Sequence, residues 1–281
     1  MGSPVFLVEN FFSAGTLGQF PDHVVSAEEE PVGNEAWRVA TGRRDADLNK
    51  WTASTANSDS YLNVVCDRTR AANTLILDGH NLAGYGFELR GSQDNWTTYE
   101  TILDVTIPSV SAPGDIDDAA GVLTEEGAWV VRFDARAYTY WRVFSNAMGA
   151  DLLPEIAWAV LGMSYSPDYV DKPVDVETTD LFAGESVSED GWLGRGDATR
   201  AQAGTINITL SSFIEYDLAR YHLNGLFAKG YPMWYLQDEA QAERAFAVVR
   251  PKARFGFKYD QQWGYERANI PYIEHQPSET R

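Results

Sequence analysis

The sequence predicts a mainly β protein whose first half is an antiparallel β-sandwich. Two observations lead to this prediction. Short segments in which apolar and polar residues alternate recur along the chain, and clusters of Gly, Pro, Asn and Asp separate them. In a strand, a period of two places alternate side chains on opposite faces, so that one face can pack in a core. Short strands of this kind favour an antiparallel sandwich over alternating β and α units.

The segment 74–94 is the clearest part of this pattern and predicts two strands joined by a polar corner. Leu75 and Leu77 alternate with polar or smaller neighbours before the corner. Residues 78–81, with the sequence DGHN, interrupt the alternation, and it resumes at Phe87. Glycines in and after the corner provide the conformational freedom for a tight return.

Further strands are expected on both sides of this segment. Upstream, residues 51–67 carry an alternating apolar face, and downstream we expect strands at residues 129–133, 140–144 and 156–163. The side chains expected to face the core are Leu62, Val64 and Cys66 upstream, and Trp129, Val131 and Phe133 downstream. Residues 107–126 are rich in Pro, Gly, Ala and acidic side chains, which predicts a protruding loop or an insertion.

The N-terminal residues 1–34 contain a short apolar strand candidate, Val5–Val8, followed by glycines, a proline and the acidic residues 28–30. Two interpretations are open for this segment. It is an arm that leads into the first domain, or it is a first strand that packs on the sandwich.

The second half, residues 166–281, is expected to be a β-rich domain with one helix near residues 212–229. Ser212 and Glu215 form a capping box at its start, and an apolar stripe follows at helical spacing. Gly230 and Pro232 end it. Strands are expected at residues 205–210, 233–236, 246–249, 253–259 and 269–274.

The composition is that of a folded globular protein, with 44% hydrophobic and 13% aromatic residues in 281. The formal net charge of −19 repels phosphate backbones and anionic membrane surfaces, so we expect no direct nucleic-acid binding. No apolar run approaches membrane-spanning length, so no membrane insertion is expected. The single cysteine, Cys66, cannot form a disulfide within the chain, and the first residues lack the features of a signal peptide. Folding in a reducing cytoplasm is therefore expected.

No catalytic signature occurs in the sequence. The nucleophile elbow, the phosphate-binding loop, the zinc-protease helix motif and the dinucleotide-binding glycine pattern are all missing, so we expect a protein that is not an enzyme. The four histidines are scattered. His80 lies in the polar corner, where its imidazole either borders a ligand or satisfies nearby backbone groups.

The order of the sandwich segments resembles the galactose-binding-like, or discoidin-type, jelly roll. The resemblance rests on a W-x-A at residues 51–53 before a Y-L-x-V strand, then on GHNL at 79–82, YWRV at 140–143 and a closing strand that ends in Leu-Gly at 161–162. It covers residues 35–165, which is the size of one domain. It implies a galactose-binding-like jelly-roll sandwich followed by the second, β-rich domain.

Joined to the second half, this domain resembles a structural protein of the tail tip or baseplate of long-tailed bacteriophages. The second half contributes the sequence GRGDATR at residues 194–200, the capped helix and a terminal IPYIE at residues 270–274. The resemblance implies a symmetric homo-oligomer that assembles with other tail proteins and is located in the virion after synthesis in the host cytoplasm. Residues 1–34 would then be the arm, 35–165 the sandwich and 166–281 the assembly domain.

A carbohydrate-binding module that contacts a host surface glycan is the alternative function. Sugar binding requires aromatic platforms together with hydrogen-bonding side chains in loops. Loop residues Asn95, Trp96 and Tyr99 meet this requirement, and the corner residues His80 and Asn81 are candidates for the same ligand. Core or edge packing is the competing interpretation of each tryptophan.

No cofactor is expected, and a structural calcium ion is the alternative to a site without one. Asp45, Asp47 and Asn49 alternate in a way that a calcium loop can use, but the glycine and the distal glutamate of an EF-hand are missing. The competing interpretation is a polar turn before Trp51.

Overall fold

The structure is a computed structural model. The residues that it describes are 5–14, 18–28, 31, 33, 35–40, 50–56, 58–149, 152–167, 169–182, 185–187, 193–195, 198–210, 217, 219–229, 231–236, 242, 246–251, 255, 257–260 and 265–274. Most of them lie in β-strands, so the predicted mainly β fold class is confirmed.

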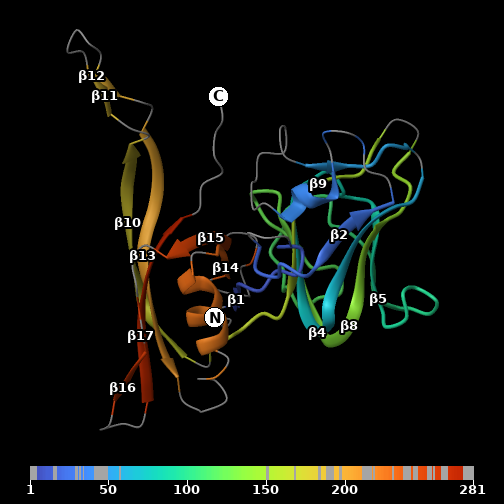
Figure 1. Cartoon of the computed structure of the whole chain (residues 1–281). Helices are drawn as coiled ribbons and strands as arrows, with labels where there is room; N and C mark the ends of the chain where they lie inside the picture. The colour runs from blue at the N-terminus through green and yellow to red at the C-terminus, as the bar shows by residue number, and fades with distance from the viewer. Residues whose placement is uncertain are drawn as a thin grey trace. The chain divides into compact units, whose positions relative to one another are not determined.

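The chain forms two compact units (Figure 1). The first comprises residues 1–166, 234–246 and 277–281, and the second comprises residues 167–233 and 247–276. The first unit thus includes a short segment from the second half of the sequence. The division into an arm, a sandwich domain and an assembly domain stays a prediction.

The first unit is a β-sandwich. In chain order its elements are β1 (Val5–Leu7), β2 (Val24–Ala27), the 3-10 helix η1 (Ala36–Ala40), β3 (Trp51–Thr52), β4 (Ser60–His80), β5 (Gly86–Ser92), β6 (Glu100–Thr106), β7 (Val122–Leu123), β8 (Trp129–Ser145) and β9 (Glu155–Gly162). Strand β14 (Met233–Leu236) pairs with β1.

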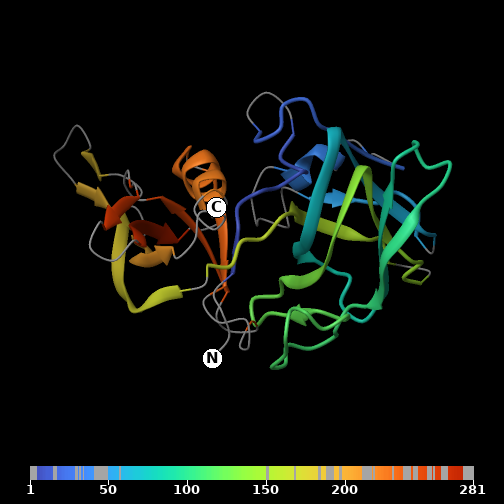
Figure 2. The same ribbon diagram turned by 90° about the horizontal axis from the view of Figure 1, so that it is seen from below.

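Two long strands, β4 and β8, run through both layers of the sandwich and lie side by side (Figures 1 and 2). The first half of β4 pairs with β2 and with the second half of β8, and that half of β8 also pairs with β5, which pairs with β6. The second half of β4 pairs with β9 and with the first half of β8. Irregular pairing after Val65 and again after Ala72 divides the two halves.

The strands expected at 129–133 and 140–144 are one strand, β8, and those expected before and after residue 70 are likewise one strand, β4. In β4 and in β8, the residues between the two expected strands include no Gly or Pro, so no turn-forming residue ends the strand there. Both strands change layer at a bulge instead of a turn.

The core lies between the two layers and is formed by the side chains that the period of two predicts. Leu62, Val64, Leu75 and Leu77 of β4 are buried. The ring of Phe87 from one layer meets the ring of Trp129 from the other, with 4.9 Å between centroids. The predicted core positions of β4 are confirmed, and Phe133 at the start of the bend packs partly buried against the core.

The N-terminal segment is an integral part of the first unit. Val5 pairs with Leu236, and the backbone groups of Phe6 and Tyr165 exchange two hydrogen bonds of 2.7 Å. The Phe11 N–H donates to the Leu161 carbonyl at 2.8 Å, so the segment continues along β9. Of the two interpretations of this segment, the packed strand describes its apolar part.

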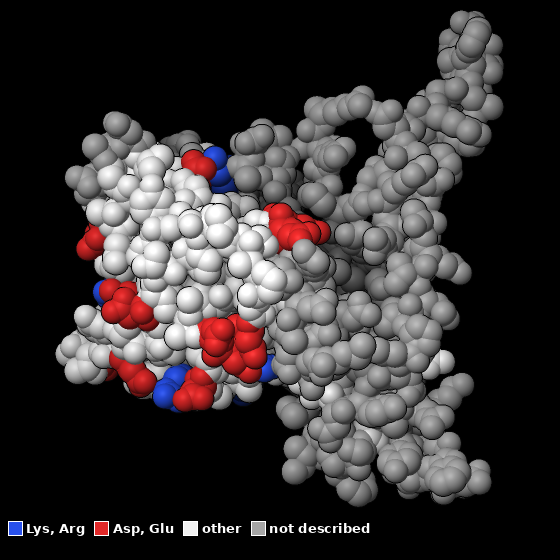
Figure 3. Space-filling view, turned by 180° about the vertical axis from the view of Figure 1, so that it is seen from behind, with Lys and Arg blue, Asp and Glu red and all other residues white. Residues whose placement is uncertain are grey.

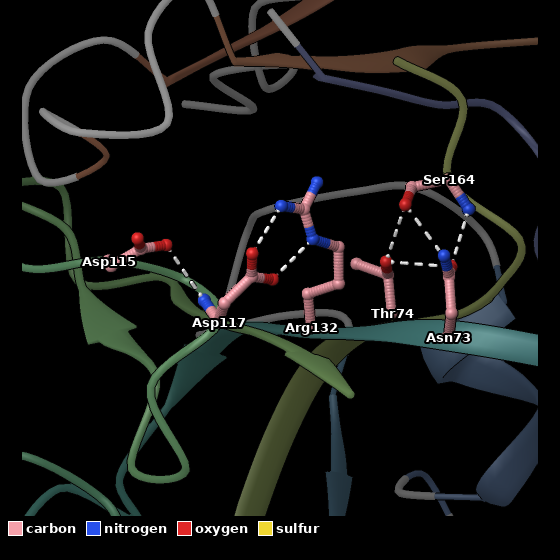
Figure 4. Close-up of polar contacts among 6 residues, drawn as sticks. All are labelled: Asn73, Thr74, Asp115, Asp117, Arg132 and Ser164. Carbon is pink, nitrogen blue, oxygen red and sulfur yellow. Dashed lines mark hydrogen bonds and ion pairs between the residues drawn. The ribbon is translucent and has the colours of Figure 1, made fainter. Parts of the chain in front are cut away.

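Residues 107–126 are largely exposed, as expected for a loop or an insertion, but isolated positions within the segment are buried against the sandwich. Ile107 and Ile116 are buried, and the Arg132 N–H donates to the Ile116 carbonyl. The Asp117 carboxylate forms an ion pair with the Arg132 guanidinium (Figure 4). The isolated apolar residues of this polar segment therefore anchor it to β8.

The second unit contains a twisted antiparallel sheet in the order β15 (Phe246–Pro251), β17 (Tyr265–Glu274), β13 (Ala198–Leu210) and β10 (Tyr169–Phe182), with β16 (Lys258–Asp260) also paired to β17. Strands β11 (Glu185–Val187) and β12 (Leu193–Arg195) form a separate pair. Strand β10 was not predicted. Part of the predicted strand 253–259 lies outside the described residues.

The predicted helix is present in its second half, as η2 (Arg220–Leu226) and η3 (Phe227–Lys229), shown in orange in Figure 1. The Phe227 N–H reaches the carbonyls of both His222 and Leu223, which is the wider hydrogen bonding of a π-helix. The capping residues Ser212, Glu215 and Gly230 lie outside the described residues. Among the helices that the structure describes, none has the length and apolar character needed to span a membrane.

Candidate functional site

One outer surface of the sandwich carries arginine and aromatic side chains in place of the small polar residues usual on an exposed sheet. It comprises the outward positions of the first half of β4, the second half of β8 and β5, together with the loop that follows β5. We call this surface the arginine–aromatic face; its residues are Tyr61, Asn63, Glu88, Arg90, Trp96, Tyr99, Tyr140, Arg142 and Phe144.

Strand register brings these side chains together. Arg142 in β8 is directly opposite Asn63 on one side and Arg90 on the other. Phe144 is likewise opposite both Tyr61 and Glu88. Directly opposite side chains in an antiparallel pair have Cβ atoms about 5 Å apart, so these residues form contacts across three strands.

The Arg142 guanidinium contacts two aromatic rings. Its central carbon lies 3.9 Å from the centroid of the Tyr61 ring and 3.9 Å from that of Trp96. Its Nε donates a hydrogen bond of 2.8 Å to Asn63 Oδ1. These three contacts hold the planar guanidinium in one orientation.

Arg90 forms a second arrangement of the same type. Its guanidinium carbon is 3.9 Å from the centroid of the Phe144 ring and 5.0 Å from that of Tyr99. Its Nε donates to Glu88 Oε2 at 2.7 Å, and this bond is the main cause that raises the pKa of Arg90. Glu88 therefore neutralises Arg90.

Arg142 has no carboxylate within ion-pair distance in the part of the chain that the structure describes. Burial lowers the pKa of its guanidinium, and the adjacent positive charge of Arg90 acts in the same direction. Like charges directly opposite each other in a sheet disfavour the pairing. The face thus contains a partly buried positive charge that is not balanced locally.

The loop after β5 holds Trp96 through a network of short hydrogen bonds. Ser92 Oγ accepts from the Trp96 N–H at 3.0 Å and donates to Asp94 Oδ1 at 2.9 Å. The Asp94 carboxylate also accepts from the backbone N–H and the hydroxyl of Thr98, at 2.9 and 2.7 Å. The Thr98 hydrogen bonds lower the pKa of Asp94, because they stabilise the charged carboxylate.

Two consecutive residues of this loop have a left-handed backbone. The φ angle is 54° at Asn95 and 70° at Trp96. Asparagine tolerates this region, but a bulky residue such as tryptophan is an outlier there, at a cost of about 1–3 kcal/mol. Strain of this kind persists where the surrounding bonds impose it, and it concentrates at functional sites.

His80 and Asn81 lie at the other end of β5. The corner that contains them precedes the first residue of β5, Gly86, whereas the Trp96 loop follows its last, Ser92. Seven residues of extended strand span about 20 Å, so the structure does not bring the predicted ligand residues into one site.

The corner residues are engaged within the fold. Asn81 Nδ2 donates to the Leu153 carbonyl at 2.8 Å, and its Oδ1 accepts from the Glu155 N–H at 2.9 Å. His80 Nδ1 accepts from the Leu82 N–H at 3.1 Å. Burial lowers the pKa of His80 to about 4, so its imidazole is neutral near pH 7. A structural role accounts for Asn81 and for Nδ1 of His80, whereas the buried Nε2 of His80 has no hydrogen-bond partner among the described residues.

The predicted metal ligands Asp45, Asp47 and Asn49 lie outside the described residues. Within the described part of the chain, no group of three or more His, Cys, Asp or Glu side chains is arranged to hold a metal ion. The calcium site stays a prediction.

The sequence pattern indicated Asn95, Trp96 and Tyr99 but not the strand residues of the same face. These are Tyr61, Asn63, Arg90, Arg142 and Phe144. A signal for them exists in the YWRVF segment, where Trp141 and Val143 face the core, and Tyr140, Arg142 and Phe144 occupy the alternate positions. An aromatic or arginine at every outward position is unusual for a solvated strand face.

The acidity of the chain is distributed rather than gathered at one place on the surface visible in Figure 3. There the described Asp and Glu side chains lie in separate groups, some of them beside Lys or Arg side chains, with uncharged residues between the groups. The net charge of −19 therefore does not imply a single continuous acidic site on that surface.

No protein-family model matches the chain, and no curated protein sequence matches it. Several solved structures are similar. A chitosan-binding module from the chitosanase/glucanase of Paenibacillus sp. IK-5 is 16% identical with a TM-score of 0.37, over 50% of this chain and 94% of that one. A CBM32 module from Clostridium perfringens, in complex with GalNAc-β-1,3-galactose, is 14% identical with a TM-score of 0.37, over 50% and 94% of the two chains. A pectin-binding carbohydrate-binding module is 13% identical with a TM-score of 0.36, over 49% and 88%.

Proposed function

We propose that the sandwich binds carbohydrate at the arginine–aromatic face, without turnover. The observation that carries this proposal is Trp96, an aromatic residue held in a strained left-handed conformation by the Ser92–Asp94–Thr98 network. The core has no need of this geometry, because Trp96 lies outside the buried cluster. The strained backbone is explained if its function is to present the indole ring on the outer surface.

The chemistry of the face suits a sugar ring. Sugars present apolar C–H surfaces that pack on aromatic rings, and hydroxyl groups that need hydrogen-bond partners. Trp96 and Tyr99 provide the rings, and Tyr99 is 55% exposed. Asn63 and the two arginines provide planar hydrogen-bonding groups beside them.

The face is organised before any ligand binds. Both guanidinium groups are held by rings and by one Nε hydrogen bond each, and the loop is held by its own hydrogen bonds. A ligand therefore needs to order few side chains, which improves affinity for a given set of contacts.

A panel of immobilised glycans tests the proposal with the whole protein and its Trp96→Ala variant. Loss of the indole should weaken binding at least about 10-fold, because aromatic anchors dominate such contacts. Trp37→Ala is the matched control, since Trp37 is a tryptophan that is 54% exposed in η1, away from the face. Failure of the unaltered protein to bind any glycan, or equal binding by W96A, would contradict the proposal.

A second candidate is assembly into a phage tail tip or baseplate as a symmetric homo-oligomer located in the virion. One observation supports it. Among the described residues, the 14-residue strand β10 pairs with β13 on one side and with no strand on the other. An unpaired strand edge of this length is a template for pairing with another chain. In such an assembly, the carbohydrate would be a glycan on the host surface.

The native mass of the purified protein tests assembly, by light scattering coupled to size exclusion. A discrete trimer or hexamer is the expected result. A monomer at all concentrations, together with absence of the protein from purified virions, would remove this candidate and leave carbohydrate binding unaffected.

A further inference from the structure

The two arginines of the arginine–aromatic face are opposite each other in the sheet, and only one has a carboxylate partner. Glu88 binds Arg90 through Nε. Arg142 binds the neutral amide of Asn63. Glu28 and Asp59 are close enough to act on the two guanidinium groups through space, but neither forms an ion pair with them. One positive charge therefore remains on this face.

Each guanidinium also retains unused donors. An arginine has five N–H groups, and in both residues the Nε–H is the only one with an acceptor among the described residues. The N–H groups on the Nη atoms are therefore available to a ligand. A carboxylate accepts two parallel hydrogen bonds from such a group, which is the strong, directional form of this contact.

The aromatic contacts hold these donors in position. The rings of Tyr61 and Trp96 orient the guanidinium plane of Arg142. The rings of Phe144 and Tyr99 orient that of Arg90. Arginine loses less freedom per hydrogen bond when it is already oriented in this way. Partial burial strengthens the attraction for an anion, because the surrounding dielectric is lower than in water.

We propose that this face selects acidic saccharides and that Arg142, with Arg90 beside it, binds the carboxylate of a uronic-acid or similar acidic sugar unit. This inference rests on the proposed carbohydrate binding and specifies its ligand class. The aromatic rings pack against the sugar ring while the guanidinium groups bind its carboxylate. The anion also relieves the repulsion between the two opposed arginines.

The experiment compares acidic oligosaccharides with their methyl esters on the whole protein, by calorimetric titration. The ester has the same ring and hydroxyl groups but carries no charge. Binding of the acid should be at least about 10-fold tighter, in line with a hydrogen-bonded ion pair. It should also weaken as ionic strength rises from about 0.05 to about 0.5 M, as expected for an attraction between charges.

Arg142→Gln should remove the preference for the acid, and Arg142→Lys should restore only part of it, because lysine lacks the planar fork. Arg132→Gln is the matched control, since Arg132 is an arginine of the same strand β8 in its other half. The thermal unfolding of each variant is recorded in parallel. The comparison of acid and ester on the unaltered protein tests the inference even if R142Q does not fold.

The outcomes separate this inference from the function on which it rests. Equal binding of acid and ester, with both lost in W96A, overturns the acidic preference and leaves carbohydrate binding in place. Binding to neither overturns both. Binding to a sulfated polymer such as dextran sulfate, without binding to carboxylated sugars, overturns the carboxylate assignment. An unchanged acid preference in R142Q overturns the role of Arg142.

Discussion

At the scale of single residues, the loop after β5 shows how a few polar groups impose an unfavourable backbone. Ser92 is 1% exposed, and its hydroxyl accepts from the N–H groups of both Asp94 and Trp96. The left-handed conformation of Asn95 and Trp96 depends on these bonds, because nothing in tryptophan itself favours it.

Ser92→Ala should therefore destabilise the protein and release the loop. It removes the acceptor of two part-buried backbone N–H groups, which costs about 1 kcal/mol each, the net value of a hydrogen bond that water can partly replace. Urea unfolding measures the loss, and glycan affinity should fall with it. Ser58→Ala is the control, because it removes a solvent-exposed hydrogen bond from the Ser58 hydroxyl to the Thr55 carbonyl. Unchanged stability in S92A would show that the network does not hold the loop.

His80 predicts a specific dependence of stability on pH. Its folded pKa of about 4 is below the ordinary histidine value of 6.5, because burial disfavours the charged imidazolium. The unfolded chain thus binds a proton between these pH values that the folded chain does not. The contribution of neutral His80 to the free energy of unfolding is fully present above pH 6.5. It is lost as the pH decreases to about 4, by an amount on the order of 3 kcal/mol.

His80→Asn retains an acceptor for the Leu82 N–H and removes the titrating group. Urea midpoints at several pH values should decline less steeply from pH 6.5 to about 4 in this variant than in the unaltered protein. Burial also lowers the pKa of His222 to about 4, so His222 contributes to the decline in both proteins, and the difference between the two slopes isolates His80. Identical slopes would contradict the assignment.

At the scale of elements, the N-terminal segment is held against β9 by close backbone approach. A Cβ added at Gly162 would overlap the carbonyl group of Glu9, which is backbone and cannot rotate away. The glycine is therefore required by the contact between two segments that are far apart in the sequence.

Gly162→Ala should displace the N-terminal segment and lower the free energy of unfolding by about 1–3 kcal/mol, as overpacking does. Thermal unfolding and protease sensitivity near residues 9–12 are the measurements. Gly225→Ala is the control, because an added Cβ there makes only ordinary van der Waals contact. Unchanged protease sensitivity in G162A would mean that the segment does not depend on this approach.

At the scale of the whole molecule, the first unit is discontinuous in sequence. Residues 234–246 belong to it, and the Trp234 ring lies 4.8 Å from the Trp158 ring of β9, between centroids. Trp158 and Trp234 are both buried. The first unit therefore includes a packed segment that lies well beyond residue 166 in the sequence.

A fragment of residues 1–166 should consequently be less stable than the whole chain. It lacks the partner strand of β1 and the ring that covers Trp158. We expect a lower melting temperature and stronger binding of a hydrophobic dye, because the fragment exposes large apolar side chains. If the fragment has the same melting temperature as the sandwich in the intact protein, residues 234–246 do not stabilise the sandwich and the prediction is wrong.

The sequence alone determined the fold class, the positions of most strands and which side chains of β4 face the core, because these follow from local alternation and turn residues. It also identified Trp96 and Tyr99 as surface aromatics. It separated β4 and β8 into shorter strands, because a bulge leaves no signature as strong as Gly or Pro.

Only the tertiary structure decided the composition of the candidate site. Arg90 and Arg142 are far apart in the chain, and strand register alone makes them opposite neighbours. Register also placed His80 and Asn81 at the far end of β5 from Trp96. Alternation determines which face a side chain occupies, but the partner across the sheet depends on which strands pair. The packing of the whole core determines which strands pair.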